Sequence, residues 1–110
     1  MQRDDVIRLR HMLDAAREAV TFTAPKSRDD LKADRMLVLS LVKSIEIIGE
    51  AASKVSEETR AVSPSIPWQD ITAMRNRLIH AYFDINLDIV WDTVIKELPP
   101  LISELEKILQ

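Results

Sequence analysis

Apolar residues recur along most of this chain at alternating three- and four-residue steps, the spacing that aligns one face of an α-helix. The first such stretch begins at Asp4 or Asp5, either of which can cap a helix, and runs to about Val20. Its continuous apolar seam consists of Val6, Leu9, Leu13, Ala16 and Val20. The sequence Thr23-Ala24-Pro25 then ends the predicted helix.

The second stretch, from about Arg28 to about Val55, is the longest and the most apolar. Ser27 followed by Asp30 resembles a capping box that opens it. Its main seam consists of Leu31, Val38, Leu41, Ile45, Ile48, Ala52 and Val55. Further apolar positions extend round the other side, at Met36, Leu39 and Ile47. Two explanations stay open, a central helix packed on two neighbours or a second face buried by a partner subunit.

Two groups of residues interrupt the apolar character of this predicted helix. Small residues gather at Gly49, Ala51, Ala52 and Ser53, and such a patch lets another helix approach closely. Glu46 and Glu50 are four residues apart, and the simplest reading is that both are solvated. They are also natural partners for Arg75, further along the chain.

The remainder of the chain predicts shorter helices. Residues 56–67 form a connector with breaks at Pro64 and Pro67, and Pro67 suits the first position of a helix that runs to about Tyr82. Asp84 or Asn86 is expected to cap a fourth helix. Its apolar positions are Leu87, Val90, Trp91, Val94 and Leu98. Pro99-Pro100 then kinks or restarts a final helix that carries Leu101, Leu105 and Ile108.

Four to five helices with short connections predict an all-α antiparallel bundle, and the length of 110 residues predicts one domain, 1–110. A single glycine supports the helical class, and the absence of cysteine excludes disulfides and fits a reducing cytoplasm. We expect no signal peptide and no membrane span, because charges occur both at the N-terminus and within the central apolar run. With a net charge of −3, any nucleic-acid role would need a local basic patch.

Candidate chemistry is concentrated in the ten residues 74–83, MRNRLIHAYF. If these residues are helical, one apolar stripe forms with Arg75 near its middle. The members of that stripe are Trp68, Ile71, Leu78, Ile79 and Tyr82. Asn76 and His80 form an i, i+4 pair on the shoulder of the stripe, and Arg77 lies further round. An arginine on an apolar face has to be paired or line a cleft.

Arginine and histidine without a metal suit the cleavage of RNA. Histidine can accept the proton of a 2′-hydroxyl or return one to the leaving oxygen, while arginine holds phosphate oxygens and stabilises the transition state. With two histidines and no cysteine, we expect no structural metal site and no metal cofactor. The structural alternative places Arg75 buried on a carboxylate and His80 at a rim.

Helical geometry adds a condition on how these two side chains meet. At i, i+5, Arg75 and His80 are turned by about 140° from each other, so one helix presents them at opposite edges of a cleft. Two copies meeting about a two-fold axis would instead bring two arginines and two histidines into one groove.

The segment RNRLIHAYF, with Arg75, Asn76, His80 and Tyr82 in place, resembles the R-x4-H-x-Y motif of the HepT-like toxins in the HEPN superfamily. The resemblance covers nearly the whole chain and includes the segments Ile45–Ser56 and Ile66–Asn76. It implies a HEPN-type homodimer in which Arg75 and His80 of both subunits line a metal-independent ribonuclease site.

The resemblance also implies a toxin–antitoxin pair whose antitoxin is a minimal nucleotidyltransferase of the MntA type. This partner would neutralise the toxin by attaching AMP to Tyr82, next to the RNA-binding groove. Two alternatives stay open: a catalytically silent HEPN dimer that serves as a binding module for the same partner, and a purely structural bundle if Arg75 is fully buried on Glu46 or Glu50.

Overall fold

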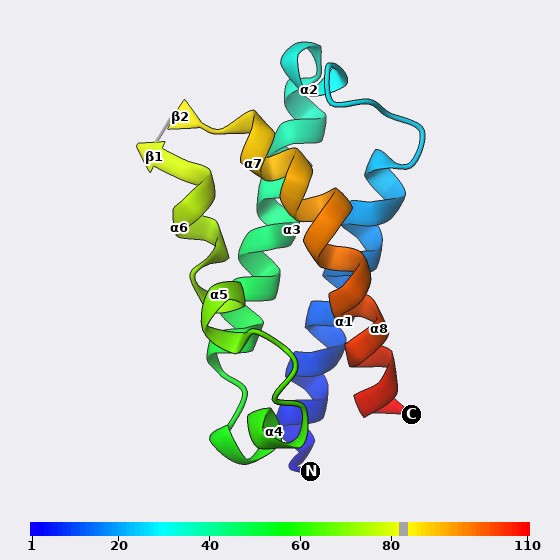
Figure 1. The fold of residues 1–110 in the computed structure, drawn as a ribbon, viewed down its shortest axis with the longest axis vertical. Coiled ribbons are helices and arrows are strands. Elements are labelled where there is room, and N and C mark those ends of the chain that lie inside the picture. The colour runs from blue at the N-terminus through cyan, green and yellow to red at the C-terminus, as the bar shows by residue number, and fades with distance from the viewer. Residues whose placement is uncertain (82–83) are drawn as a thin grey trace.

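The chain passes through the bundle four times, in alternating directions, as Figure 1 shows. The computed structural model describes residues 1–81 and 84–110, with residues 79–81 described in their backbone only. α1 (Arg3–Thr23) is antiparallel to α3 (Arg35–Ser53), and the two short helices α5 (Trp68–Thr72) and α6 (Met74–Leu78) return along α3. The last pass comprises α7 (Leu87–Asp92), the π-helical segment η1 (Thr93–Glu97) and α8 (Leu98–Leu109). The predicted all-α antiparallel bundle is therefore confirmed.

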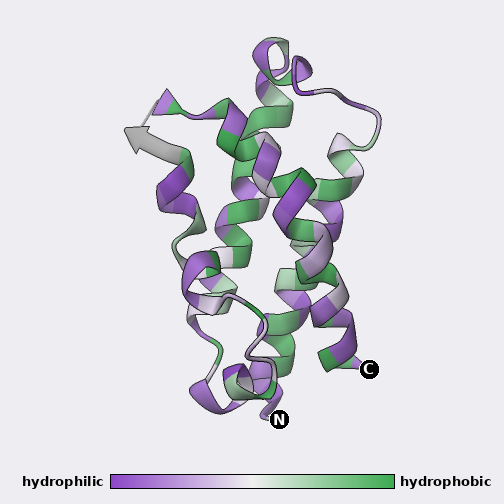
Figure 2. Cartoon of the chain, viewed as in Figure 1, coloured by the Kyte–Doolittle hydropathy of each residue, from purple (hydrophilic) through white to green (hydrophobic). Residues whose placement is uncertain are grey.

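The core lies where the predicted seams of the long helices face each other. Leu9, Leu41, Ile45 and Ile48 are completely buried, together with Leu105 of α8. Figure 2 shows apolar and polar residues alternating along these helices, as burial of one face requires. Within the described residues, the structure contains no helix that is both long enough and apolar enough to cross a membrane.

A buried carboxylate in the first turn of α1 ties this helix to a distant segment and does not cap it. Gln2 occupies the N-cap position, so the prediction that Asp4 or Asp5 caps the helix is wrong. Asp5 instead accepts hydrogen bonds from the backbone N–H of Ser56 at 3.0 Å and from the hydroxyls of Ser56 and Thr59, both at 2.6 Å. The Ser56 and Thr59 hydroxyls lower the pKa of Asp5, because they stabilise its charged form. This network ties α1 to α4 (Glu57–Val62).

The long helix predicted for residues 28–55 is divided in two. A short helix, α2 (Asp30–Ala33), precedes α3, and Asp34 between them has a non-helical backbone. The Asp34 carboxylate accepts the N–H of Leu37 at 3.0 Å and so caps α3. Only one hydrogen bond of the predicted capping box forms, from the N–H of Ser27 to the Asp30 carboxylate at 2.7 Å. Asp29, not Ser27, occupies the N-cap of α2, and no side chain caps that helix, so the complete capping box is not formed. The Asp34 cap overrides the helical spacing of the apolar residues on either side of it.

Gly49 allows α5 to lie directly against α3. A Cβ atom at Gly49 would approach the carbonyl oxygen of Ile71 to 3.2 Å and that of Thr72 to 3.4 Å. The predicted close approach at this patch of small residues is confirmed. It sets the position of α5, and therefore of α6 and Arg75, relative to the face of α3 that carries Glu46.

The final helical pass is irregular before the two prolines. Asn86 caps α7, as predicted, by accepting the N–H of Ile89 at 3.1 Å. Pro99 and Pro100 lack the N–H groups that would bond the carbonyls of Ile95 and Lys96 in an α-helix. The π-helical segment lies at these carbonyls, so the predicted interruption takes the form of a widened turn that continues into α8.

Candidate functional site

The motif segment is helical only in its first half. Ala73 forms a turn between α5 and α6, and α6 ends at Leu78. Ile79–Ala81 then form strand β1, which pairs antiparallel with β2 (Asp84–Ile85). The prediction of a helix to about Tyr82 is wrong, and so are the i, i+4 and i, i+5 relations that it gave His80 with Asn76 and Arg75.

The hairpin explains why the helix stops. The carbonyl of Leu78 accepts the N–H of Asn86 at 2.8 Å, and Ile79 is paired with Ile85. Pairing with the returning chain, together with a β-branched residue at Ile79, outweighs the helical spacing of the apolar residues. The backbone of His80 lies in β1. Tyr82, the residue implicated in modification, lies outside the described residues.

Arg75 is exposed and forms an ion pair with Glu46 on α3. Its Nε donates to Oε1 of Glu46 at 3.1 Å, and the two side chains are 53% and 31% exposed. The predicted pairing is confirmed, but Met74 and Leu78, rather than Arg75, occupy the buried face of α6. The condition for a purely structural bundle, an Arg75 fully buried on a carboxylate, is not met.

The ion pair uses only one edge of the Arg75 guanidinium. Its terminal nitrogens, Nη1 and Nη2, form no hydrogen bond with any described residue. Two parallel N–H groups of this kind can bind two oxygens of one phosphate or carboxylate. Glu46 thus holds the Arg75 side chain in place, and the guanidinium edge formed by Nη1 and Nη2 stays available for an anion.

The other two polar residues of the motif point elsewhere. Arg77 contacts Glu97 of η1 at 3.4 Å, and Asn76 faces a shallow hollow lined by Ser53 and Arg60. Successive residues on a helix are turned by about 100°, which separates these side chains from Arg75. The structure therefore brings neither Asn76 nor Arg77 together with Arg75.

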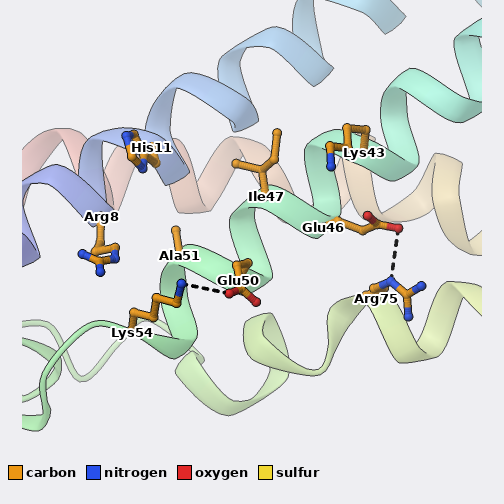
Figure 3. Close-up of a pocket in the computed structure, with 9 residues that line it drawn as sticks. All are labelled: Arg8, His11, Lys43, Glu46, Ile47, Glu50, Ala51, Lys54 and Arg75. Carbon is orange, nitrogen blue, oxygen red and sulfur yellow. Dashed lines mark hydrogen bonds and ion pairs between the residues drawn. The ribbon is translucent and has the colours of Figure 1, made fainter.

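Arg75 lines a groove between α1, α3 and α6 with a volume of about 670 Å³ (Figure 3). We call it the basic groove. Its lining residues are Arg8, His11, Lys43, Glu46, Ile47, Glu50, Ala51, Lys54 and Arg75. His11 is exposed and lies at this groove.

Cations outnumber carboxylates in the basic groove, although the chain as a whole is acidic. Both carboxylates are paired within it, Glu46 with Arg75 and Glu50 with Lys54 at 3.1 Å. Sequence reasoning did not identify this groove. The signal was present, since Lys43, Glu46, Glu50 and Lys54 recur at three- and four-residue steps on one face of α3.

An exposed apolar strip borders the basic groove. It consists of Phe22 on α1 and Met36, Leu39 and Ile47 on α3, with exposed fractions of 39%, 81%, 48% and 39%. Ile47 and Lys43 line both the basic groove and a hollow of about 370 Å³ that also contains Phe22 and Leu39. α3 is therefore packed on several neighbours and still presents a second apolar face.

Comparisons with known proteins agree on one family. The family model described as "Ribonuclease HepT-like" matches residues 12–108. A protein of Caldanaerobacter subterraneus subsp. tengcongensis, named "Putative RNase TTE0752", is 37% identical over 102 residues, which cover 93% of this chain and 91% of the relative. A Thermococcus cleftensis protein named "Probable ribonuclease HepT" is 33% identical over 87 residues and 79% of each chain. No solved structure matches the chain significantly. The chain belongs to the HepT-like ribonuclease family.

Proposed function

We propose that this chain is the toxin of a toxin–antitoxin pair, a cytoplasmic endoribonuclease that cleaves RNA with Arg75 and His80 and without a metal. One observation carries the proposal. Arg75 is exposed at the edge of a basic groove, held by Glu46 through Nε, with its two terminal nitrogens available for a phosphate. Membership of a ribonuclease family supports the same activity.

The proposed reaction uses the 2′-hydroxyl of RNA as its nucleophile. His80 accepts the proton of that hydroxyl, the 2′-oxygen attacks the adjacent phosphorus, and the bond from phosphorus to the 5′-oxygen breaks. A histidine returns a proton to the departing 5′-oxygen. The products are a 2′,3′-cyclic phosphate and a 5′-hydroxyl. Arg75 stabilises the charge that develops on the phosphate oxygens.

Metal chelation tests this function with the purified protein. Because the nucleophile belongs to the substrate, we expect cleavage of single-stranded RNA to proceed at an unchanged rate in EDTA. DNA of the same sequence should remain intact, since it lacks the 2′-hydroxyl. Loss of RNA cleavage in EDTA, restored by a divalent metal, would contradict the metal-free mechanism.

A homodimer is the second part of the proposal. The apolar strip supports it, because an exposed face of this kind on a helix is typical of a subunit interface. The strip borders the basic groove, so a two-fold interface there would place the grooves of two subunits side by side. Each subunit would then contribute one Arg75 and one His80 to a shared site.

Sedimentation equilibrium at micromolar concentration tests the dimer. We expect twice the chain mass of 12.6 kDa for the wild type and the single chain mass for Leu39→Glu, which places a charge in the apolar strip. Val62→Glu is the matched control, because Val62 is 65% exposed and lies on α4, away from the strip. A wild-type monomer, or a Leu39→Glu variant that remains dimeric, would contradict this interface.

The third part concerns control by a minimal nucleotidyltransferase antitoxin that attaches AMP to Tyr82. The phenolic oxygen would attack the α-phosphorus of ATP, the bond to the β-phosphate would break, and pyrophosphate would leave. The phenolic proton would pass to a base of the partner. The added phosphodiester carries a negative charge that would compete with RNA for Arg75.

A catalytically silent binding module for the same partner is the second candidate function. The net charge of −3 favours it, since affinity for RNA depends on neutralising phosphates. The cations of the basic groove offset this argument locally. The two functions differ in the cleavage assay, where a silent module leaves RNA intact.

A further inference from the structure

Two cations in the basic groove have no carboxylate within ion-pair distance among the described residues, although the charge of Arg8 also acts on the buried Asp5. Arg8 on α1 and Lys43 on α3 form no ion pair with any described residue, whereas Lys54 and Arg75 each have a carboxylate partner. The attraction of the groove for an anion therefore depends mainly on Arg8 and Lys43. Figure 3 shows that these side chains come from two helices and that Arg75 comes from a third.

The arrangement of these cations indicates what kind of anion the groove accepts. Three separate helices supply positive charge, so an anion with several negative groups along its length would contact more of these cations than an anion with one. A volume of about 670 Å³ is that of an ordinary ligand pocket, which holds a few nucleotides but not a duplex. The residues that line the groove include no Phe, Tyr or Trp, and His11 is the one ring among them, so base stacking contributes little.

We propose that the basic groove binds the sugar-phosphate backbone of single-stranded RNA, with Arg8 and Lys43 contacting phosphates next to the one bound by Arg75. The inference rests on the proposed function, because it assigns the path of the RNA beyond the scissile bond. The apolar lining residue Ala51 contacts sugars without reading sequence, whereas Ile47 lies at the border with the apolar strip. Binding through this groove is consequently tolerant of base sequence and sensitive to salt.

Salt-dependent binding of a short RNA tests the groove. The RNA has about ten nucleotides, within the usual size of single-strand sites, and His80→Ala protein is used so that the RNA stays intact. Arg8→Gln/Lys43→Gln is compared with Lys32→Gln/Lys107→Gln. The two control lysines are highly exposed and lie outside the basic groove. Their replacement removes the same total charge as the groove substitutions. Glutamine retains part of each aliphatic stem, and melting curves establish that both variants are folded.

We expect the groove variant to bind more weakly and to lose part of its salt dependence. For single strands, each lost phosphate contact changes the slope of log K against log salt concentration by about 0.7, so the slope should become less negative by about 1.4. The control variant should retain the wild-type slope. AMP should compete far less well than the oligonucleotide, because it presents one phosphate only.

Three results would overturn the groove assignment: equal slopes for the two variants, equal competition by AMP, or an RNA that does not bind. A change from dimer to monomer in the groove variant would also overturn it, by identifying the groove as a subunit interface. The proposed function fails separately. RNA binding that depends on Arg8 and Lys43, without cleavage by the wild type, supports the groove and rejects the nuclease.

Discussion

Alanine at His80 is expected to slow RNA cleavage by a factor of about 10²–10⁴, the usual contribution of a general acid or base. Arg75→Ala is expected to slow it by about 10²–10³, because the variant loses hydrogen bonds to the charge that develops on phosphate. Because both residues would act in one transition state, the double variant should be little slower than the slower single variant.

Loss of activity in Arg75→Ala reports on catalysis only if the variant is folded, and the structure indicates that it folds. Arg75 and Glu46 form an exposed ion pair, and such pairs contribute about 0–1 kcal/mol to stability. The melting temperature should therefore change little. Arg17→Ala is a matched control, since Arg17 is about as exposed as Arg75 and forms an ion pair with Glu106 of α8, outside the basic groove. It should retain full activity. Wild-type rates for both site variants would identify a contaminating nuclease.

Phenylalanine at Tyr82 is expected to abolish neutralisation by the proposed nucleotidyltransferase antitoxin, while nuclease activity is retained. Tyr82 is the only tyrosine in the chain, so Tyr82→Phe removes every phenolic acceptor for AMP. The ring is preserved, and the proposed acid–base chemistry depends on His80. With ATP and a divalent metal, the cognate nucleotidyltransferase should add AMP to the wild type but not to the variant. The modified wild type should lose its nuclease activity.

Intact-mass spectrometry after co-expression measures this second prediction. A mass gain on the wild type that is absent from Tyr82→Phe is the expected result. A wild-type chain that is unmodified, yet no longer toxic in the presence of its partner, would mean that the antitoxin acts by binding alone. Growth arrest by Tyr82→Phe in the presence of the partner gives a parallel readout in cells.

The helical bundle could be predicted because burial follows the spacing of apolar residues. Leu9, Leu41 and Ile45 lie on predicted seams and are completely buried. The helix boundaries were predicted less accurately, because capping side chains determine where a helix begins. Asp34 lies between α2 and α3, where the apolar spacing suits one helix, and its carboxylate caps the start of α3. Asp5 shows the same limit, since its partners Ser56 and Thr59 are about fifty residues away and no local pattern reveals them.

The candidate site could be predicted in part. The pairing of Glu46 with Arg75 followed from an acidic interruption in an apolar helix and an arginine that needed a partner. The strand after Leu78 could not be predicted from the sequence, because the spacing of Ile79 and Tyr82 also suits a helix. The pairing of Ile79 with Ile85 is a local hairpin that apolar spacing does not reveal, and it changes the relation of His80 to Arg75.

The basic groove shows what a linear sequence conceals. Arg8, Lys43 and Arg75 are separated by more than thirty residues in each case, and only the packing of α1, α3 and α6 brings them to one surface. The net charge of the chain suggested weak affinity for RNA. The local charge of the groove supports the opposite expectation, because binding depends on the cations that reach the phosphates.

The most direct test of the central claim is a single-atom change in the substrate. The RNA bond that the wild type cleaves in EDTA is first mapped, and the 2′-hydroxyl next to that bond is then replaced by hydrogen. Cleavage at this bond should disappear, while the unmodified RNA gives fragments that end in a 2′,3′-cyclic phosphate and a 5′-hydroxyl. Continued cleavage at the modified bond, or fragments that begin with a 5′-phosphate, would show that water is the nucleophile and contradict the mechanism.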